Sequence, residues 1–113
     1  MPRTIWTISL SVLLLSLTAA APSQAYFMTG NDLVETCNEK VPLFCRGVVA
    51  GYFDAMTALG YKCESIEHVT VTQAVSVVRK YLQDNPQDLN VPATYLGITA
   101  IQNAFKCKND PKR

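Results

Sequence analysis

The chain has 113 residues, 49% of them hydrophobic and 17% charged, with a formal net charge of +1 at pH 7. This length predicts a single domain. The nearly balanced charge and the lack of a basic patch or charged tail argue against binding to nucleic acid or an acidic lipid surface, both of which require clustered Lys and Arg.

The first 25 residues have the pattern of a secretory signal peptide. Arg3 precedes an almost uncharged run from Thr4 to Ala21, and residues 23–25 (Ser-Gln-Ala) place small side chains at the −3 and −1 positions of a cleavage site. A membrane anchor is the alternative, but Thr and Ser interrupt the run and no positive charge follows it. We therefore expect cleavage after Ala25, leaving residues 26–113 as one exported domain with no stable membrane anchor.

Four cysteines, Cys37, Cys45, Cys63 and Cys107, lie in the expected mature part. An even number of cysteines in a small exported chain is typical of disulfides. A zinc site is the alternative, but the spacing contains no C-x2–4-C pair and His68 is the only histidine in the chain. We expect two disulfides, no metal and no cofactor.

Helical signals begin directly after the cleavage site. Thr29, followed three residues later by Asp32, resembles a capping box and predicts a first helix that ends near Cys37. The second helix is expected to start at Pro42 and to run up to Gly60, because Pro favours the first turn and Gly the position just past the end.

Two further helices follow. Thr70 and Gln73 form a second capping-box pattern, and the Asn85-Pro86 step ends the helix that they open. The apolar face of this helix is Val71, Ala74, Val75, Val78, Tyr81 and Leu82. The last helix begins at Pro92, and its stripe is Leu96, Ala100, Ile101, Ala104 and Phe105. No alternating run is long enough for a sheet, so the expected fold is all-α, a compact four-helix domain stapled by two disulfides.

The length of the second helix restricts the disulfide pairing. Cys45 and Leu59 are 14 residues apart, about 21 Å along a continuous helix, and the four steps to Cys63 return at most about 14 Å. A disulfide needs Cα atoms within about 7 Å, which excludes Cys45–Cys63. Pairing Cys37 with Cys63 would stretch the short 37–45 connection along most of the helix. The preferred pairs are therefore Cys37–Cys45 and Cys63–Cys107.

The second helix contains two glycines, Gly47 and Gly51, on one face. Each costs roughly 0.8–1 kcal/mol relative to alanine, and a groove that admits another helix would explain both. We expect packing against the first or fourth helix, because Arg46 and Asp54 make the membrane-dimer alternative expensive. Asp54 lies close to the same face, and a structural role is expected for it, either hydrogen-bonded in the interior or at the rim.

No group of residues predicts catalysis. His68 has Glu64 and Glu67 nearby, but no serine nucleophile motif or second histidine accompanies it. Cysteines in disulfides supply no thiolate. The chain also lacks a Gly-rich phosphate loop, a C-x-x-C redox motif and a paired-carboxylate signature. We expect His68 to be a surface residue and the protein not to be an enzyme.

Several short motifs occur in a family-like order. They are F-x-T-G-N-D-L at 27–33, Cys37, C-x-G-x-x-x-G-x-x-D-A at 45–55, V-T-x-x-Q-A-x-x-V-V-x-x-Y-L at 69–82, N-P at 85–86, P-A at 92–93 and A-F-x-C at 104–107. With this order and spacing the sequence resembles the Rap/Tai family, small exported immunity proteins against peptidoglycan amidases of type VI secretion.

The resemblance implies a helical, disulfide-bonded periplasmic protein that binds an incoming amidase, blocks its active-site cleft and tends to homodimerise. Because the matched motif residues look structural, the binding surface is expected elsewhere. We expect it in the connection between the third and fourth helices, with Asp84, Asn85, Gln87, Asp88 and Asn90 exposed. The competing interpretation is a solvated loop whose polar residues only end the helix.

Two other classes of function fit the same fold. One is a small periplasmic chaperone or stress protein, which would expose apolar surface in acid. The other is an orphan family member that keeps the fold but serves another binding role in the cell envelope.

Overall fold

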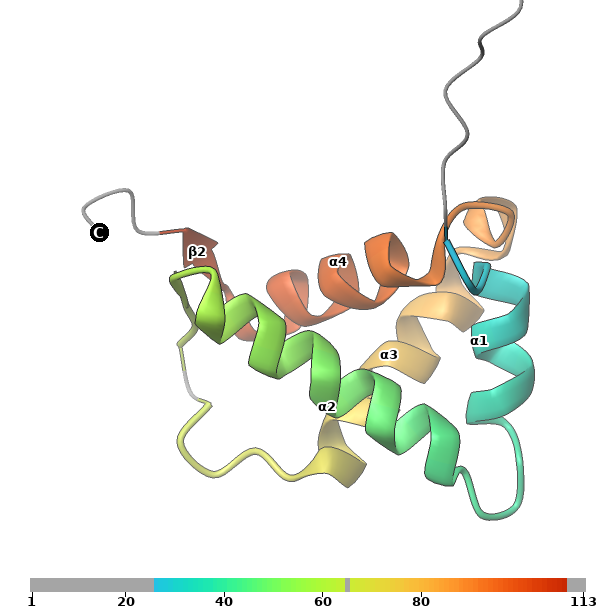
Figure 1. Cartoon of the computed structure of the whole chain (residues 1–113), viewed down its shortest axis with the longest axis horizontal. Coiled ribbons are helices and arrows are strands. Elements are labelled where there is room, and N and C mark those ends of the chain that lie inside the picture. Colours follow the sequence, from blue (N-terminus) through green and yellow to red (C-terminus); the bar gives the residue numbers. More distant parts are fainter. Residues whose placement is uncertain (1–25, 65, 110–113) are drawn as a thin grey trace, which may run out of the picture.

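The structure is a computed structural model that describes residues 26–64 and 66–109, so the expected signal peptide lies outside the described residues. The four α-helices are α1 (Gly30–Cys37), α2 (Leu43–Ala58), α3 (Val71–Asp84) and α4 (Ala93–Phe105). In Figure 1, α2 runs across the front of the domain, α4 lies above it in this view, α3 lies behind them, and α1 stands at one end. The expected compact four-helix fold is confirmed.

Both predicted capping boxes are formed. The backbone N–H of Thr29 donates to the Asp32 carboxylate at 2.9 Å, and the Thr29 hydroxyl accepts from the Asp32 N–H in return. Thr70 and Gln73 repeat this exchange at the start of α3. After α2, Gly60 adopts φ 89°, the left-handed conformation that glycine tolerates at a helix end.

The core is built by all four helices. Its fully buried side chains include Leu33 from α1, Val49 from α2, Val78 from α3 and Ile101 from α4, each with 0% of its surface exposed. The apolar faces predicted for α3 and α4 include residues that the structure does not bury. Val71 and Ala104 are exposed, and Tyr81 and Phe105 are half-buried. Val71, Ala104 and Phe105 lie in the first or last turn of their helices, and Tyr81 lies beside the buried face of α3.

Three short elements were not predicted. Strands β1 (Tyr61–Lys62) and β2 (Lys108–Asn109) pair antiparallel, and a 3-10 turn, η2 (Pro86–Asp88), lies between α3 and α4. Each strand has only two residues, too few for an alternating pattern to be visible in the sequence.

Two disulfides join the ends of these elements. Cys37 at the end of α1 bonds Cys45 in the first turn of α2, with Cα atoms 4.9 Å apart. Cys63, just after β1, bonds Cys107, just before β2. These are the two pairs that the length of α2 favours, and no cysteine in the described residues is free.

The expected helix-packing role of Gly47 and Gly51 is wrong. Both glycines are exposed, and a Cβ atom added to either would have no neighbouring atom within 4 Å. The buried residues of α2, which include Val49 and Met56, lie on the opposite side of the helix. Gly51 borders a surface groove beside the start of α4, but neither glycine lets two helices meet inside this domain.

Two other glycines, Gly97 and Gly30, allow neighbouring segments to pack closely against them. A Cβ atom on Gly97 of α4 would overlap the ring of Tyr52 on α2, so Gly97 lets these helices meet. Gly30, the first residue of α1, is buried against the backbone of Leu89 and the side chain of Leu96. The sequence does contain a sign that Gly97 packs closely, because it follows Leu96 within the apolar face of α4.

Candidate functional site

The α3–α4 connection carries the five residues that the sequence predicts for partner binding. Asp84, Gln87 and Asn90 are exposed as expected. Asn85 and Asp88 are half-buried, so the prediction of full exposure is wrong for these two. Asn85 is drawn inward because its side-chain amide donates to the Tyr81 carbonyl at 2.8 Å, which closes the end of α3.

This connection is held by its own hydrogen bonds. The Asp88 N–H donates to the Asn85 carbonyl at 3.1 Å, and the Val91 N–H donates to the Asp88 carbonyl at 3.2 Å. The Asp84 carboxylate accepts from Lys80 Nζ at 2.8 Å. Because both of those side chains are exposed, the ion pair adds little stability, and the backbone bonds determine the shape.

The connection is also fixed to the segment that precedes α1. Thr29 and Pro92 form an isolated antiparallel bridge, and the Ala93 N–H donates to the Met28 carbonyl at 2.9 Å. The connection is therefore bound at its α3 end through Asn85 and at its α4 end through the segment before α1.

A second exposed surface, the α2 face, consists of Leu43, Phe44, Gly47, Val48 and Gly51. Leu43 is 70% exposed and Phe44 is 60% exposed. None of the five residues carries a charge. An apolar surface of this kind on a small domain often marks a protein–protein contact.

Beside the α2 face lies a groove of about 420 Å³. It is lined by Val48, Gly51 and Tyr52 of α2, by the start of α4, and by residues 26–28, and it has no charged residue in its lining. Phe27 stands at this groove with its side chain fully exposed. The groove thus extends the α2 face toward the N-terminal end of the described chain.

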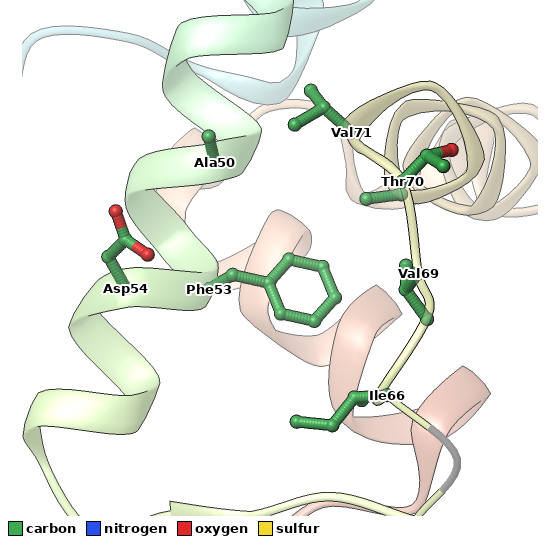
Figure 2. A pocket seen from close by; sticks show the side chains of 8 residues that line it. Ala50, Phe53, Asp54, Ile66, Val69, Thr70 and Val71 are labelled. Carbon is green, nitrogen blue, oxygen red and sulfur yellow. The ribbon is translucent and has the colours of Figure 1, made fainter.

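A smaller hollow of about 190 Å³ separates α2 from the start of α3. In Figure 2, Phe53 points into this hollow from α2, while Ile66 and Val69 approach it from the connecting segment. Asp54 lies at its edge with its carboxylate turned away from Phe53. Asp54 is exposed, which places it at the rim and not in the interior.

His68 is exposed, and no group of three or more His, Cys, Asp or Glu in residues 26–64 and 66–109 could hold a metal ion. Burial raises the pKa of Tyr52 above its ordinary value of 10.0, against the opposing effect of a hydrogen bond with Thr94. Tyr52 therefore stays protonated at neutral pH. Within the same residues, no helix is long and apolar enough to cross a membrane.

Comparison with known proteins places this architecture in a family. A model of the Rap1a immunity proteins matches residues 29–107, from the cap of α1 to the last cysteine. Neither a curated protein nor a solved structure gives a significant match. The matched range contains all four helices and both disulfides, and it confirms the resemblance seen in the ordered motifs. The chain belongs to the family of Rap1a immunity proteins, which are not enzymes.

Proposed function

We propose that the chain is a periplasmic immunity protein that binds a peptidoglycan amidase delivered by type VI secretion and occludes the active-site cleft of that enzyme. The observation that carries this proposal is the family match, which covers the complete four-helix unit. The signal-peptide pattern and the two disulfides support an oxidising compartment outside the cytoplasm.

Occlusion requires a rigid surface and no reactive group. A binding surface that is ordered before binding avoids the entropic cost of becoming ordered on contact. Disulfides at both ends of α2 and the bonded α3–α4 connection supply such rigidity. The mechanism follows from shape and hydrogen bonding alone, and it needs no cofactor.

The amidase contact is proposed at residues 84–90. Asp84, Gln87 and Asn90 offer a carboxylate and two amides to a partner on a backbone that is already fixed. The competing interpretation, a solvated loop, predicts that truncating these side chains leaves inhibition unchanged. Replacing all three by alanine separates the two interpretations, since none of the three is buried and the fold should survive.

We propose in addition that two copies of the chain pair through the α2 face and its groove. Phe27, Leu43 and Phe44 are 103%, 70% and 60% exposed. If a large apolar side chain offers on the order of 150–200 Å², these three expose roughly 400 Å² of the ~800 Å² per partner that a stable interface buries. The five residues of this face carry no charge, although the exposed Asp54 lies beside Gly51, and an apolar patch suits a two-fold contact in which it meets its own copy.

Pairing through this face is tested by light scattering of F44K beside T72K, a control at an exposed position on α3. We expect F44K to be monomeric at concentrations where the wild type and T72K are dimeric. A monomeric wild type, or an unchanged dimer in F44K, would contradict the assignment.

The amidase proposal is tested by affinity capture with the oxidised, tagged chain as bait in envelope and secreted fractions of the source organism. Mass spectrometry should identify a peptidoglycan amidase in near-stoichiometric amount. Recovery of only assorted unfolded envelope proteins would indicate a chaperone instead. An empty capture, with the amidase shown to be present, would also contradict immunity.

A further inference from the structure

The first turn of α1 holds the α3–α4 connection in place. The Gly30 N–H donates to the Val91 carbonyl, and the Asn31 N–H donates to the Leu89 carbonyl, each at 2.9 Å. The Asn31 side-chain amide also donates to the Asn90 side-chain oxygen at 3.2 Å. Three hydrogen bonds thus join two residues of α1 to residues 89–91, which are about sixty positions away in sequence.

These bonds use groups that a helix start normally leaves to solvent or to a cap. The first four N–H groups of an α-helix have no partner inside the helix. In α1 these are the N–H groups of the cap residue Thr29 and of Gly30, Asn31 and Asp32, and those of Thr29 and Asp32 are satisfied by each other's side chains in the capping box. The two between them, from Gly30 and Asn31, donate to the connection, so all four donors are satisfied.

The close approach also depends on the absence of a side chain at residue 30. A Cβ atom on Gly30 would lie 2.9 Å from both the Cα and the carbonyl oxygen of Leu89, and it would overlap the Leu96 side chain. Backbone atoms cannot move aside as a flexible side chain does. Any side chain at position 30 would therefore displace the connection at Leu89.

We infer that Gly30 and Asn31 are positioning residues for the 84–90 segment, which they hold in the geometry that binds the amidase. The inference rests on the proposed function and deepens it. It assigns a role in partner recognition to the N-terminal turn of α1, although that turn lies in a different part of the sequence from the contact itself. Gly30 acts through the backbone of the connection, and Asn31 acts through that backbone and through the Asn90 side chain.

The structural part of the inference is tested with G30A by amide hydrogen exchange on the full chain. We expect the protection of the Asp88 and Val91 amides, which bond within the connection, to fall at least tenfold relative to Ile101 in the core. G97A is the matched control, because its new Cβ would meet the Tyr52 side chain and not the connection. An equal loss of protection throughout the chain in G30A would overturn the inference.

The functional part is tested by titrating the captured amidase with the same variants under conditions where each is folded. G30A should raise the Kd at least tenfold, and G97A should leave it within about twofold of the wild type. N31A removes only the side-chain bond to Asn90 and should raise the Kd two- to fivefold. It serves as a second variant if G30A does not fold.

Failure of the positioning role can be told apart from failure of the proposed immunity function. An unchanged Kd in both G30A and N31A, or equal losses in G30A and G97A, would overturn the positioning role while leaving immunity intact. A wild-type chain that binds no amidase would overturn the proposed function. In that case the exchange experiment alone decides whether Gly30 and Asn31 position the connection.

Discussion

The ring of Tyr52 lies directly against Gly97, so close that the smallest side chain on residue 97 would overlap it. Tyr52 is 9% exposed and Gly97 is buried, and the pair brings α2 and α4 together at the centre of the domain. This contact leaves no room for a side chain at position 97 of the α2–α4 interface.

We expect G97A to be destabilised by about 1–3 kcal/mol, the usual cost of adding a methyl group to a well-packed interior. The Tyr52 ring must move for the new Cβ to fit, and its neighbours are already in contact. Urea denaturation followed by circular dichroism measures the difference. A G97A variant as stable as the wild type would show that α2 and α4 can separate at no cost.

The opposite result is expected for G47A. No atom would lie within 4 Å of the new Cβ, and alanine is a better helix former than glycine by roughly 0.8–1 kcal/mol. Unfolding measured at high dilution, where self-association is suppressed, should therefore show a gain of about that size. A loss of stability would mean that Gly47 has a close neighbour in solution that the single chain does not contain.

The contrast between these glycines shows what the sequence could and could not predict. Capping boxes and helix ends depend on residues a few positions apart, so Thr29, Asp32 and Gly60 were sufficient to place them. Which side of α2 is buried depends on the other helices. Because α2 has apolar residues all round, its pattern does not reveal the buried side, and Gly47 was assigned to the wrong face.

The candidate site was predictable to a similar extent. The polar segment after α3 is visible in the sequence as a helix stop, Asn85-Pro86, followed by Gln87, Asp88 and Asn90. Its attachment to α1 is not visible, because the bonds of Gly30 and Asn31 to residues 89–91 join positions that only the fold brings together. The half-burial of Asn85 has a local cause, since its side-chain amide donates to the Tyr81 carbonyl four residues before it.

Alkaline pH should destabilise the protein through Tyr52. Burial raises the pKa of this phenol in the folded state above 10.0, so the folded chain keeps a proton that the unfolded chain loses. The stability is fully present below about pH 10 and falls as the pH rises through the folded pKa. Y52F, which cannot titrate there, should show a smaller decrease between pH 9 and 11 in denaturant titrations. Equal decreases in both chains would assign the effect to other groups.

The two disulfides should differ in their resistance to reduction. Cys37 and Cys45 are 1% and 0% exposed, whereas Cys63 and Cys107 are half-buried. A mild thiol reductant should therefore reach Cys63–Cys107 first in the folded protein. Alkylation followed by peptide mapping identifies the order, and early labelling of Cys37 or Cys45 would contradict it.

Loss of the Cys63–Cys107 bond should also lower the free energy of unfolding. The bond closes a loop with a sequence separation of 44, and on the chain-entropy account such a loop contributes about 4 kcal/mol. The shorter Cys37–Cys45 loop, with a separation of 8, contributes about 2.6 kcal/mol on the same account. The C63A/C107A double variant tests the first value by urea denaturation, and an unchanged midpoint would contradict it.

The central claim is that this chain inhibits a peptidoglycan amidase by binding it. The most direct measurement follows the hydrolysis of purified peptidoglycan by the captured amidase while the oxidised chain is added in increasing amounts. We predict that hydrolysis stops near one chain per enzyme, and that the alanine variant of Asp84, Gln87 and Asn90 fails to stop it at that ratio. Full hydrolysis in the presence of excess folded wild-type chain would contradict the claim.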